Sequence, residues 1–231
     1  MNKEEFTHEC NKIGINITED KLKKIDRYKE LLIEWNSKFN LTTIIEEKDI
    51  YLKHFYDSLC LAIITDLNNK EICDFGTGAG FPGLVLAIVF DNSKYTLLES
   101  NGKKVTFLNE VKKELDLDNV TIINDRVENY GKNNRELFDI VTCRAVSNLN
   151  IILELSVSLL KVDGLFIPMK SNVDEELENS NKKTNILGYN LLEKKEYELP
   201  YENAKRTLLM YKKIKKTDSK YPRNYNLIKK Q

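Results

Sequence analysis

Cysteine, histidine and long apolar runs are scarce in this chain. Its 231 residues include four cysteines and two histidines, and the cysteines form no C-x-x-C pair. A structural zinc site is therefore not expected, and we expect the cysteines to be buried or neutral thiols. The longest strongly apolar stretch, residues 82–90, is far shorter than the roughly 20 residues that cross a bilayer. With no secretory signal pattern in the acidic first ten residues, the sequence predicts a cytoplasmic protein with no membrane or metal partner.

Positive charge is concentrated near the C-terminus although the whole chain is neutral. The 36 Lys and Arg residues balance 36 Asp and Glu residues, yet residues 212–231 contain eight basic side chains and one acidic one. Such a tail is typical of a segment that binds an anionic polymer, and it is equally typical of a solvated chain end. The count alone leaves both interpretations open.

The first 65 residues are expected to be helical. Apolar residues recur every three or four positions from Leu22 to Phe39, behind Thr18 as the expected N-cap. The same spacing returns from Ile50 to Ile63. Residues 1–65 are therefore assigned to an N-terminal helical segment.

Residues 66–231 follow a different pattern, in which short apolar runs alternate with helical stripes. This alternation is typical of β–α–β units and predicts a doubly wound α/β domain with a mostly parallel, seven-stranded sheet. The strand-like runs 189–199 and 206–214 lie too close together for a crossover helix between them. They are therefore predicted to pair antiparallel, so that the last strand is reversed. The domain ends in the basic tail, residues 212–231.

The first strand of this domain ends in the glycine-rich sequence DFGTGAGFPG. The dinucleotide motif G-x-G-x-x-G is matched by Gly78, Gly80 and Gly83. The D-x-G-x-G-x-G loop of methyltransferases that use S-adenosyl-L-methionine (AdoMet) is matched by Asp74, Gly76, Gly78 and Gly80. Either match alone is weak. A pyrophosphate would favour the bare helix N-terminus, whereas Asp74 would provide negative charge for the ammonium of AdoMet.

Two further strand ends carry acidic side chains. Glu99 ends the second strand, where a carboxylate can accept hydrogen bonds from both hydroxyls of a ribose, and residues 125–128 follow the third strand at the level of an adenine. The antiparallel final pair favours AdoMet over a dinucleotide, by analogy of fold. The Asn/Asp-Pro-Pro-aromatic clamp of amino-group methyltransferases is absent from TCRAVSNL after the fourth strand. An exocyclic amine is therefore not the expected acceptor.

Seven segments spread over nearly the whole chain share their sequence with one family. They are WNSKFNLTTI (35–44), HFYDSL (54–59), DFGTGAGFPG (74–83), LLESNGKKVTFL (97–108), RVE (126–128), CRAV (143–146) and YPR (221–223). With these segments the chain resembles the bacterial small-subunit ribosomal RNA 7-methylguanosine methyltransferases, also called glucose-inhibited division protein B. The chain departs from the family pattern at Cys143, at MKS (169–171) and after YPR, where Gly-x-Pro is missing.

The resemblance implies methyl transfer from AdoMet to the N7 atom of one guanine in 16S ribosomal RNA, either naked or within a small-subunit assembly intermediate. It also implies cofactor contacts at Gly76, Phe81, Val127, Glu128 and Arg144. Together with the strand-end residues, the predicted cofactor set is Asp74, Gly76, Gly78, Gly80, Phe81, Glu99, Val127, Glu128 and Arg144.

The N7 atom already has a free lone pair in the base plane, so its methylation needs no general base. Catalysis would then come mainly from alignment of donor and acceptor. Arg144 is predicted to be the catalytic residue, with a binding and orienting role. Two alternatives stay open: an RNA pyrimidine methyltransferase with Cys143 as its nucleophile, and a non-catalytic dinucleotide-binding module.

Contacts with RNA phosphates are predicted for the N-terminal helices and the tail, since cations there can neutralise phosphates without reading bases. The tail cations are Lys212, Lys213, Lys215, Lys216, Lys220 and Arg223.

Overall fold

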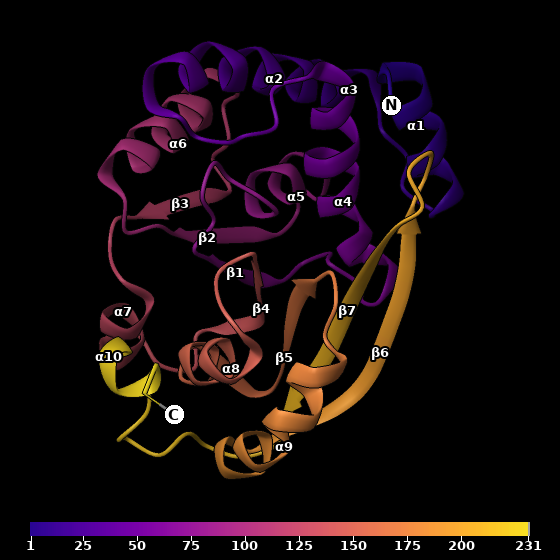
Figure 1. The fold of residues 1–231 in the computed structure, drawn as a ribbon. Coiled ribbons are helices and arrows are strands. Elements are labelled where there is room, and N and C mark those ends of the chain that lie inside the picture. Colours follow the sequence, from indigo (N-terminus) through magenta and orange to yellow (C-terminus); the bar gives the residue numbers. More distant parts are fainter. Residues whose placement is uncertain (231) are drawn as a thin grey trace.

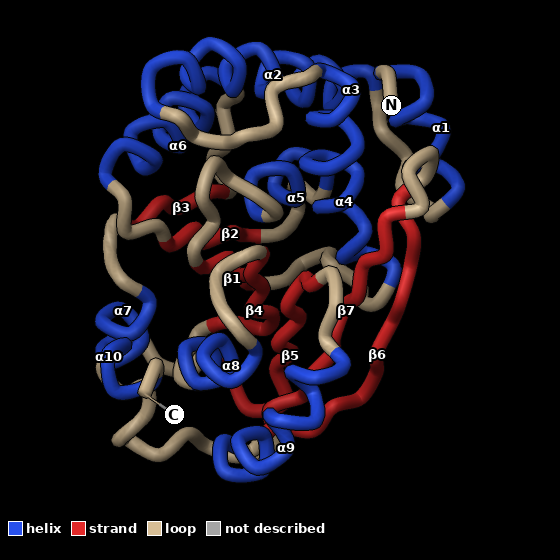
Figure 2. The backbone as a smooth tube through the Cα atoms, viewed as in Figure 1, coloured by secondary structure: helices blue, strands red, loops and turns tan. Residues whose placement is uncertain are grey.

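A computed structural model describes residues 1–230 (Figures 1 and 2). One seven-stranded sheet has the strand order β3-β2-β1-β4-β5-β7-β6. Neighbouring strands from β3 to β5 are parallel, and β7 is antiparallel to both β5 and β6. The predicted doubly wound fold with a reversed last strand is confirmed. The strands are β1 (Glu71–Phe75), β2 (Lys94–Leu98), β3 (Val120–Ile123), β4 (Phe138–Arg144), β5 (Leu160–Lys170), β6 (Tyr189–Leu199) and β7 (Ala204–Lys213).

Helices cover both faces of the sheet (Figure 1). Successive side chains of a strand point to opposite faces, so Ile72 of β1 joins an apolar cluster under α2 and α5, while Cys73 joins a second cluster under α8. The β2 residues Leu97 and Leu98 divide in the same way. The helices after the first strand are α5 (Gly83–Val89), α6 (Gly102–Glu114), α7 (Val127–Asn133), α8 (Leu149–Val157), α9 (Asp174–Leu187) and α10 (Tyr225–Ile228).

The N-terminal segment is helical and packs against the first cluster. Thr18 caps the long helix α2 as predicted, because its hydroxyl accepts a hydrogen bond from the Lys21 amide. The second expected helix is not a uniform α-helix, since its centre is a π-helical turn with six of its seven residues buried. A π turn often marks a functional site. The elements are α1 (Lys3–Lys12), α2 (Glu19–Phe39), α3 (Glu47–Asp49), the π turn η1 (Ile50–Tyr56), α4 (Asp57–Leu59) and the 3-10 turn η2 (Cys60–Ile63).

After β7 the chain returns across the molecule. It passes α9 and ends with α10 beside α7 (Figure 1). Within residues 1–230, no helix is both long and apolar enough to span a membrane.

Two cations of the basic tail are engaged inside the protein. Lys213 is fully buried, and its ammonium donates hydrogen bonds to Glu136 and to the Val157 and Leu160 carbonyls at 2.9, 3.0 and 2.7 Å. Arg223 forms an ion pair with the buried Glu154. The prediction that Lys213 binds an RNA phosphate is therefore wrong, because leaving its partners would strand polar groups in the interior. For Arg223 the phosphate contact stays a prediction.

Lys213→Met is expected to lower the free energy of unfolding by about 2 kcal/mol or more, because two buried carbonyls lose their donor. The neighbouring Lys212→Met is the matched control, since Lys212 forms an ion pair with the exposed Asp163. Its expected effect is within about 0.5 kcal/mol. Urea unfolding followed by circular dichroism measures both. Equal urea midpoints for the two variants would contradict a stabilising role for the buried Lys213 ammonium.

Candidate functional site

The loop after β1 has a backbone that requires glycine. Gly76, Gly78 and Gly80 have φ values of 64°, 64° and 102°, which side chains rarely tolerate. A Cβ on Gly80 would lie 2.5 Å from the Tyr28 hydroxyl, whereas one on Gly78 would meet only the Lys104 ammonium, at 4.0 Å. Gly80 therefore allows close packing against Tyr28, whereas Gly78 faces open space.

Asp74 ties the two ends of this loop together. Its Oδ2 accepts hydrogen bonds from the Thr77 hydroxyl at 2.6 Å and from the Gly83 amide at 2.8 Å. Burial raises the pKa of the carboxyl to about 7, although these two hydrogen bonds act in the opposite direction. Its Oδ1 is buried and has no partner among residues 1–230. The loop thus has an unpaired acceptor at its base.

Two more predicted carboxylates lie next to the loop. The Glu99 carboxylate accepts hydrogen bonds from the Gly78 amide at 2.9 Å and from the Asn101 amide at 2.8 Å. Glu128 accepts one from Arg126 Nε at 3.2 Å. Both glutamates are buried, and the hydrogen bond from the Gly78 amide to Glu99 fixes the end of β2 in relation to the glycine loop.

A first pocket, of about 180 Å³, lies where the segments after β1, β2, β3 and β4 meet. It includes three of the predicted cofactor residues, Gly76, Val127 and Glu128, while Glu99 lies between two lining residues. The sequence analysis missed Tyr225 of the tail and Leu155 of α8, which no local motif marks. The lining residues are Phe75, Gly76, Leu98, Ser100, Asp125, Arg126, Val127, Glu128, Val146, Leu155 and Tyr225.

The side chains of Phe81 and Arg144 contact the N-terminal segment rather than the first pocket. The Phe81 ring stacks on His54 with a centroid distance of 4.1 Å, and the Arg144 guanidinium lies 5.3 Å from the Phe81 centroid. Arg144 Nη1 also donates to the Lys53 carbonyl and to Asp57 Oδ2, both at 3.0 Å. Cofactor contact by Phe81 and Arg144 stays a prediction.

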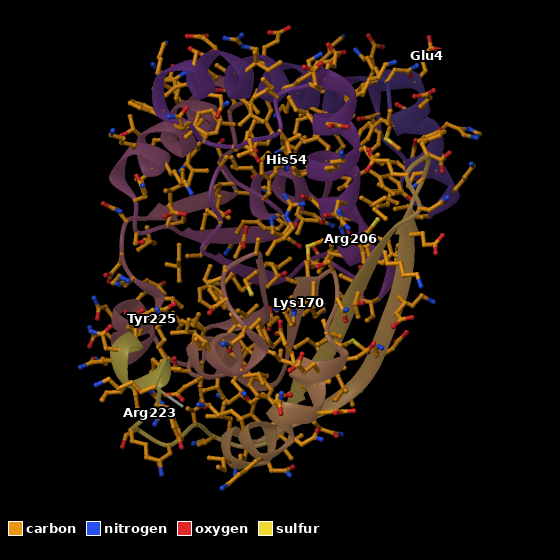
Figure 3. The ribbon with its side chains drawn as sticks, viewed as in Figure 1. Glu4, His54, Lys170, Arg206, Arg223 and Tyr225 are labelled. Atoms are coloured by element: carbon orange, nitrogen blue, oxygen red, sulfur yellow. The ribbon has the colours of Figure 1, made fainter. Side chains whose placement is uncertain are left out.

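A second pocket, of about 640 Å³, lies on the other side of the segment after β4. Ala145 lines the second pocket and Val146 lines the first, so consecutive residues face separate spaces. His54, Lys170 and Arg206 of the lining are labelled in Figure 3. The lining is mixed in charge and comprises Thr42, Thr43, Ile44, Lys53, His54, Asp57, Arg144, Ala145, Met169, Lys170, Ser171, Asn172, Glu176 and Arg206.

His54 is held as a neutral imidazole. Arg144 Nη2 lies 3.3 Å from His54 Nδ1. Arginine has no acceptor, so Nδ1 must present its lone pair. The proton is then on Nε2, which lies 2.9 Å from the Thr42 hydroxyl. Burial, and next the positive charge of Arg144, lower the pKa of His54 to about 3. This histidine therefore does not exchange protons near neutral pH.

Cys143 is a poor nucleophile. Its side chain is buried, and burial raises the pKa of the thiol well above its ordinary value. Because the thiolate is the reactive form, this environment disfavours the covalent alternative. Among residues 1–230 no group of three or more His, Cys, Asp or Glu side chains is placed to hold a metal ion.

Residues 21–207 match the family model of rRNA small subunit methyltransferase G. The chain belongs to this family. It is 44% identical over 225 residues to ribosomal RNA small subunit methyltransferase G of Fusobacterium nucleatum, covering 97% of both chains. It is 42% identical over 227 residues to the protein of that name from Bacillus subtilis, covering 96% of this chain and 95% of the relative.

Solved structures with the same fold are more distant in sequence. TYW2 of M. jannaschii in complex with AdoMet has a TM-score of 0.53 at 18% identity, over 63% of this chain and 70% of that one. A precorrin methyltransferase from Geobacter metallireducens has a TM-score of 0.54 at 16% identity, over 76% and 91%. The fold is that of AdoMet-dependent methyltransferases.

His54→Gln is expected to flatten the dependence of stability on pH. Below pH 6.5 the unfolded chain takes up a proton on this imidazole, whereas the folded chain does so only near pH 3. The contribution of neutral His54 to the free energy of unfolding is therefore fully present above pH 6.5. It falls as the pH is lowered, by about 2–3 kcal/mol between pH 7 and pH 4.5.

Denaturant unfolding at several pH values measures this slope. The exposed His8 of α1 provides the control variant His8→Gln, whose slope is expected to equal that of the parent protein. If the free energy of unfolding of His54→Gln depended on pH as steeply as that of the parent protein, a neutral, buried His54 would be contradicted.

Proposed function

We propose that this protein transfers a methyl group from AdoMet to the N7 atom of a guanine in 16S ribosomal RNA. One observation supports the proposal more than any other: the consecutive residues Ala145 and Val146 line two different pockets. A donor bound on one side and an acceptor base on the other would meet at this segment. The substrate named for the family members, small-subunit ribosomal RNA, is consistent with this arrangement.

The residues of the first pocket and the glycine loop fit AdoMet. The Glu99 and Glu128 carboxylates would accept hydrogen bonds from the ribose and the adenine, and the unpaired Oδ1 of Asp74 favours a cationic ligand nearby. The pocket is smaller than the roughly 300 Å³ of common ligand sites, so the amino-acid end would extend along the glycine loop, where Gly78 leaves space. When bound, the cofactor supplies an electrophilic methyl group on a sulfonium.

The second pocket suits a nucleotide of the RNA. Its volume of about 640 Å³ accommodates a base with its sugar. Arg144 and Arg206 both approach Asp57, at 3.0 and 3.5 Å, and Lys170 pairs with Glu176. A phosphate entering here would find cations that are already oriented and partly desolvated.

The chemistry of the pocket agrees with N7 as the acceptor. The N7 lone pair would accept the methyl group from the sulfonium, and the positive charge would pass from sulfur to the purine without loss of a proton. His54 stays neutral, so it adds no charge against the purine cation. Arg144 holds the segment that separates donor from acceptor, and we assign it the role of aligning the two.

The product identifies the function. Incubation of the protein and AdoMet, labelled on its methyl group, with small subunits or 16S rRNA lacking the modification is expected to label the RNA. Nuclease digestion followed by mass spectrometry should then yield 7-methylguanosine. A labelled pyrimidine would contradict the guanine assignment, and unlabelled RNA would contradict methyl transfer.

Variants of the adjacent residues Cys143 and Arg144 extend the same assay. Cys143→Ala should keep most activity, because no covalent step is required. Arg144→Lys keeps the charge but loses the fork that contacts both Lys53 and His54. It should give the same product about tenfold more slowly, a cost of about 1.4 kcal/mol.

Gly78→Ala is expected to weaken AdoMet binding about tenfold, because the added methyl group would occupy the open side of the loop and disturb the amide held by Glu99. Gly14→Ala is the matched control. Gly14 also has a positive φ, of 79°, and nothing lies within 4 Å of its added Cβ. Both variants should lose about 1–2 kcal/mol of stability through backbone strain.

Titration calorimetry with AdoMet measures the difference between the two glycine variants. Equal affinities for AdoMet in folded Gly78→Ala and Gly14→Ala would contradict the proposal that AdoMet binds along the glycine loop.

A further inference from the structure

The segment after β7 folds back onto α7 and α8, where Arg135 fastens it. Arg135 Nη1 donates to the Tyr221 carbonyl at 2.7 Å, and its Nη2 donates to the carbonyls of Thr217 and Asp218 at 3.1 and 3.2 Å. Three backbone acceptors on one guanidinium define the path of the chain. This part of the tail is therefore a built element of the domain.

A buried carboxylate fixes the tail a second time. Glu154 of α8 has a fully buried side chain, and its two oxygens accept hydrogen bonds from Arg223 Nε at 2.7 Å and Nη2 at 2.5 Å. Its Oε1 also accepts from the Arg223 amide at 3.1 Å, and Lys183 contacts Oε2 at 2.6 Å. Burial alone would raise the pKa of Glu154, yet these donors hold it below its ordinary value. Such bidentate contacts fix geometry as well as charge.

The anchored tail presents Tyr225 to the first pocket. Tyr225 begins α10 and is half-buried, and Ile228 of the same helix is buried in the cluster under α8. The Arg126 guanidinium lies 5.5 Å from the centre of the Tyr225 ring. Figure 3 shows Arg223 and Tyr225 together at the edge of the domain, away from His54 and Arg206. The tail thus belongs to the donor side of the site.

The pocket has the character of an adenine site at this end. Val127, Leu155 and Tyr225 provide apolar walls, and the Glu128 carboxylate lies among them. A purine ring needs flat apolar contacts on its faces and a few polar partners at its edge. Stacking of a base on an aromatic ring contributes about 1–3 kcal/mol.

We propose that Tyr225 is a cofactor-binding residue that covers the adenine of AdoMet, and that the Arg223–Glu154 pair is the positioning contact that holds it there. This inference rests on the proposed function, because it names a further residue of the same donor site. It assigns part of the basic tail to the cofactor rather than to RNA.

Titration calorimetry with S-adenosylhomocysteine, the methyl-free product, tests the ring directly. Tyr225→Ala should raise Kd about tenfold, and Tyr225→Phe should stay within about twofold of the parent, since stacking needs the ring and not the hydroxyl. Tyr201→Ala is the control, because Tyr201 is exposed in the turn between β6 and β7. Its Kd should be unchanged.

A double-mutant cycle tests the positioning role. Arg223→Gln should weaken binding of S-adenosylhomocysteine, and the combination with Tyr225→Ala should be no weaker than Tyr225→Ala alone, because both changes remove one contact. Arg223→Lys should restore part of the affinity. Additive losses would show that Arg223 acts by another route and would overturn its assigned role.

The outcomes separate this inference from the proposed function. Parent protein that binds S-adenosylhomocysteine, with a folded Tyr225→Ala variant that binds equally well, would overturn the tail inference and leave the donor site in place. Parent protein that binds neither AdoMet nor S-adenosylhomocysteine would overturn both. If Tyr225→Phe and Tyr225→Ala bound S-adenosylhomocysteine equally weakly, the inference would also be overturned, because the ring would then not be the contact.

Discussion

The guanidinium of Arg144 joins the two parts of the molecule that make the site. It lies at the end of β4 and contacts the Lys53 carbonyl, the His54 ring and the Asp57 carboxylate, all from the N-terminal segment. A hydrogen bond to a charged group contributes about 1.5–3 kcal/mol, so this cluster is a strong local constraint. Loss of this guanidinium would remove three contacts that tie the end of β4 to the N-terminal segment.

Buried titratable side chains fix other irregular segments of the chain through hydrogen bonds and ion pairs. Asp74 closes the glycine loop, Glu154 holds the tail, and Lys213 locks the end of β7. A buried polar or charged group is costly unless it has partners, so each of these groups stabilises one particular conformation of the backbone around it. The glycine loop, the tail and the end of β7 are thereby each held in place at a specific point.

Much of the fold and part of the site could be predicted from local pattern. Strand and helix periodicity predicted the sheet and its reversed strand, and the strand ends predicted Gly76, Val127 and Glu128, which line the first pocket. Tyr225 was not predictable, because its place depends on a tail anchored by residues far away in sequence. A charge count likewise treats Lys213 as solvated, since burial is a property of the fold alone. The π turn at Ile50–Tyr56 escaped a pattern based on 3.6 residues per turn.

The chemistry explains why rigidity matters more here than proton transfer. An N7 acceptor needs no base, and His54, which contacts Arg144, is held neutral by burial and by that cation. What is left for the protein to provide is alignment, and alignment in favourable cases corresponds to an effective molarity of order 10⁵ M or more. In the proposed reaction, the glycine loop, the segment around Ala145 and the tail would each contribute a surface to that alignment. Each is held by its own contact, from Asp74 of β1 to the loop, from Arg144 to the N-terminal segment and from Glu154 of α8 to the tail, so the two pockets can keep their relative positions.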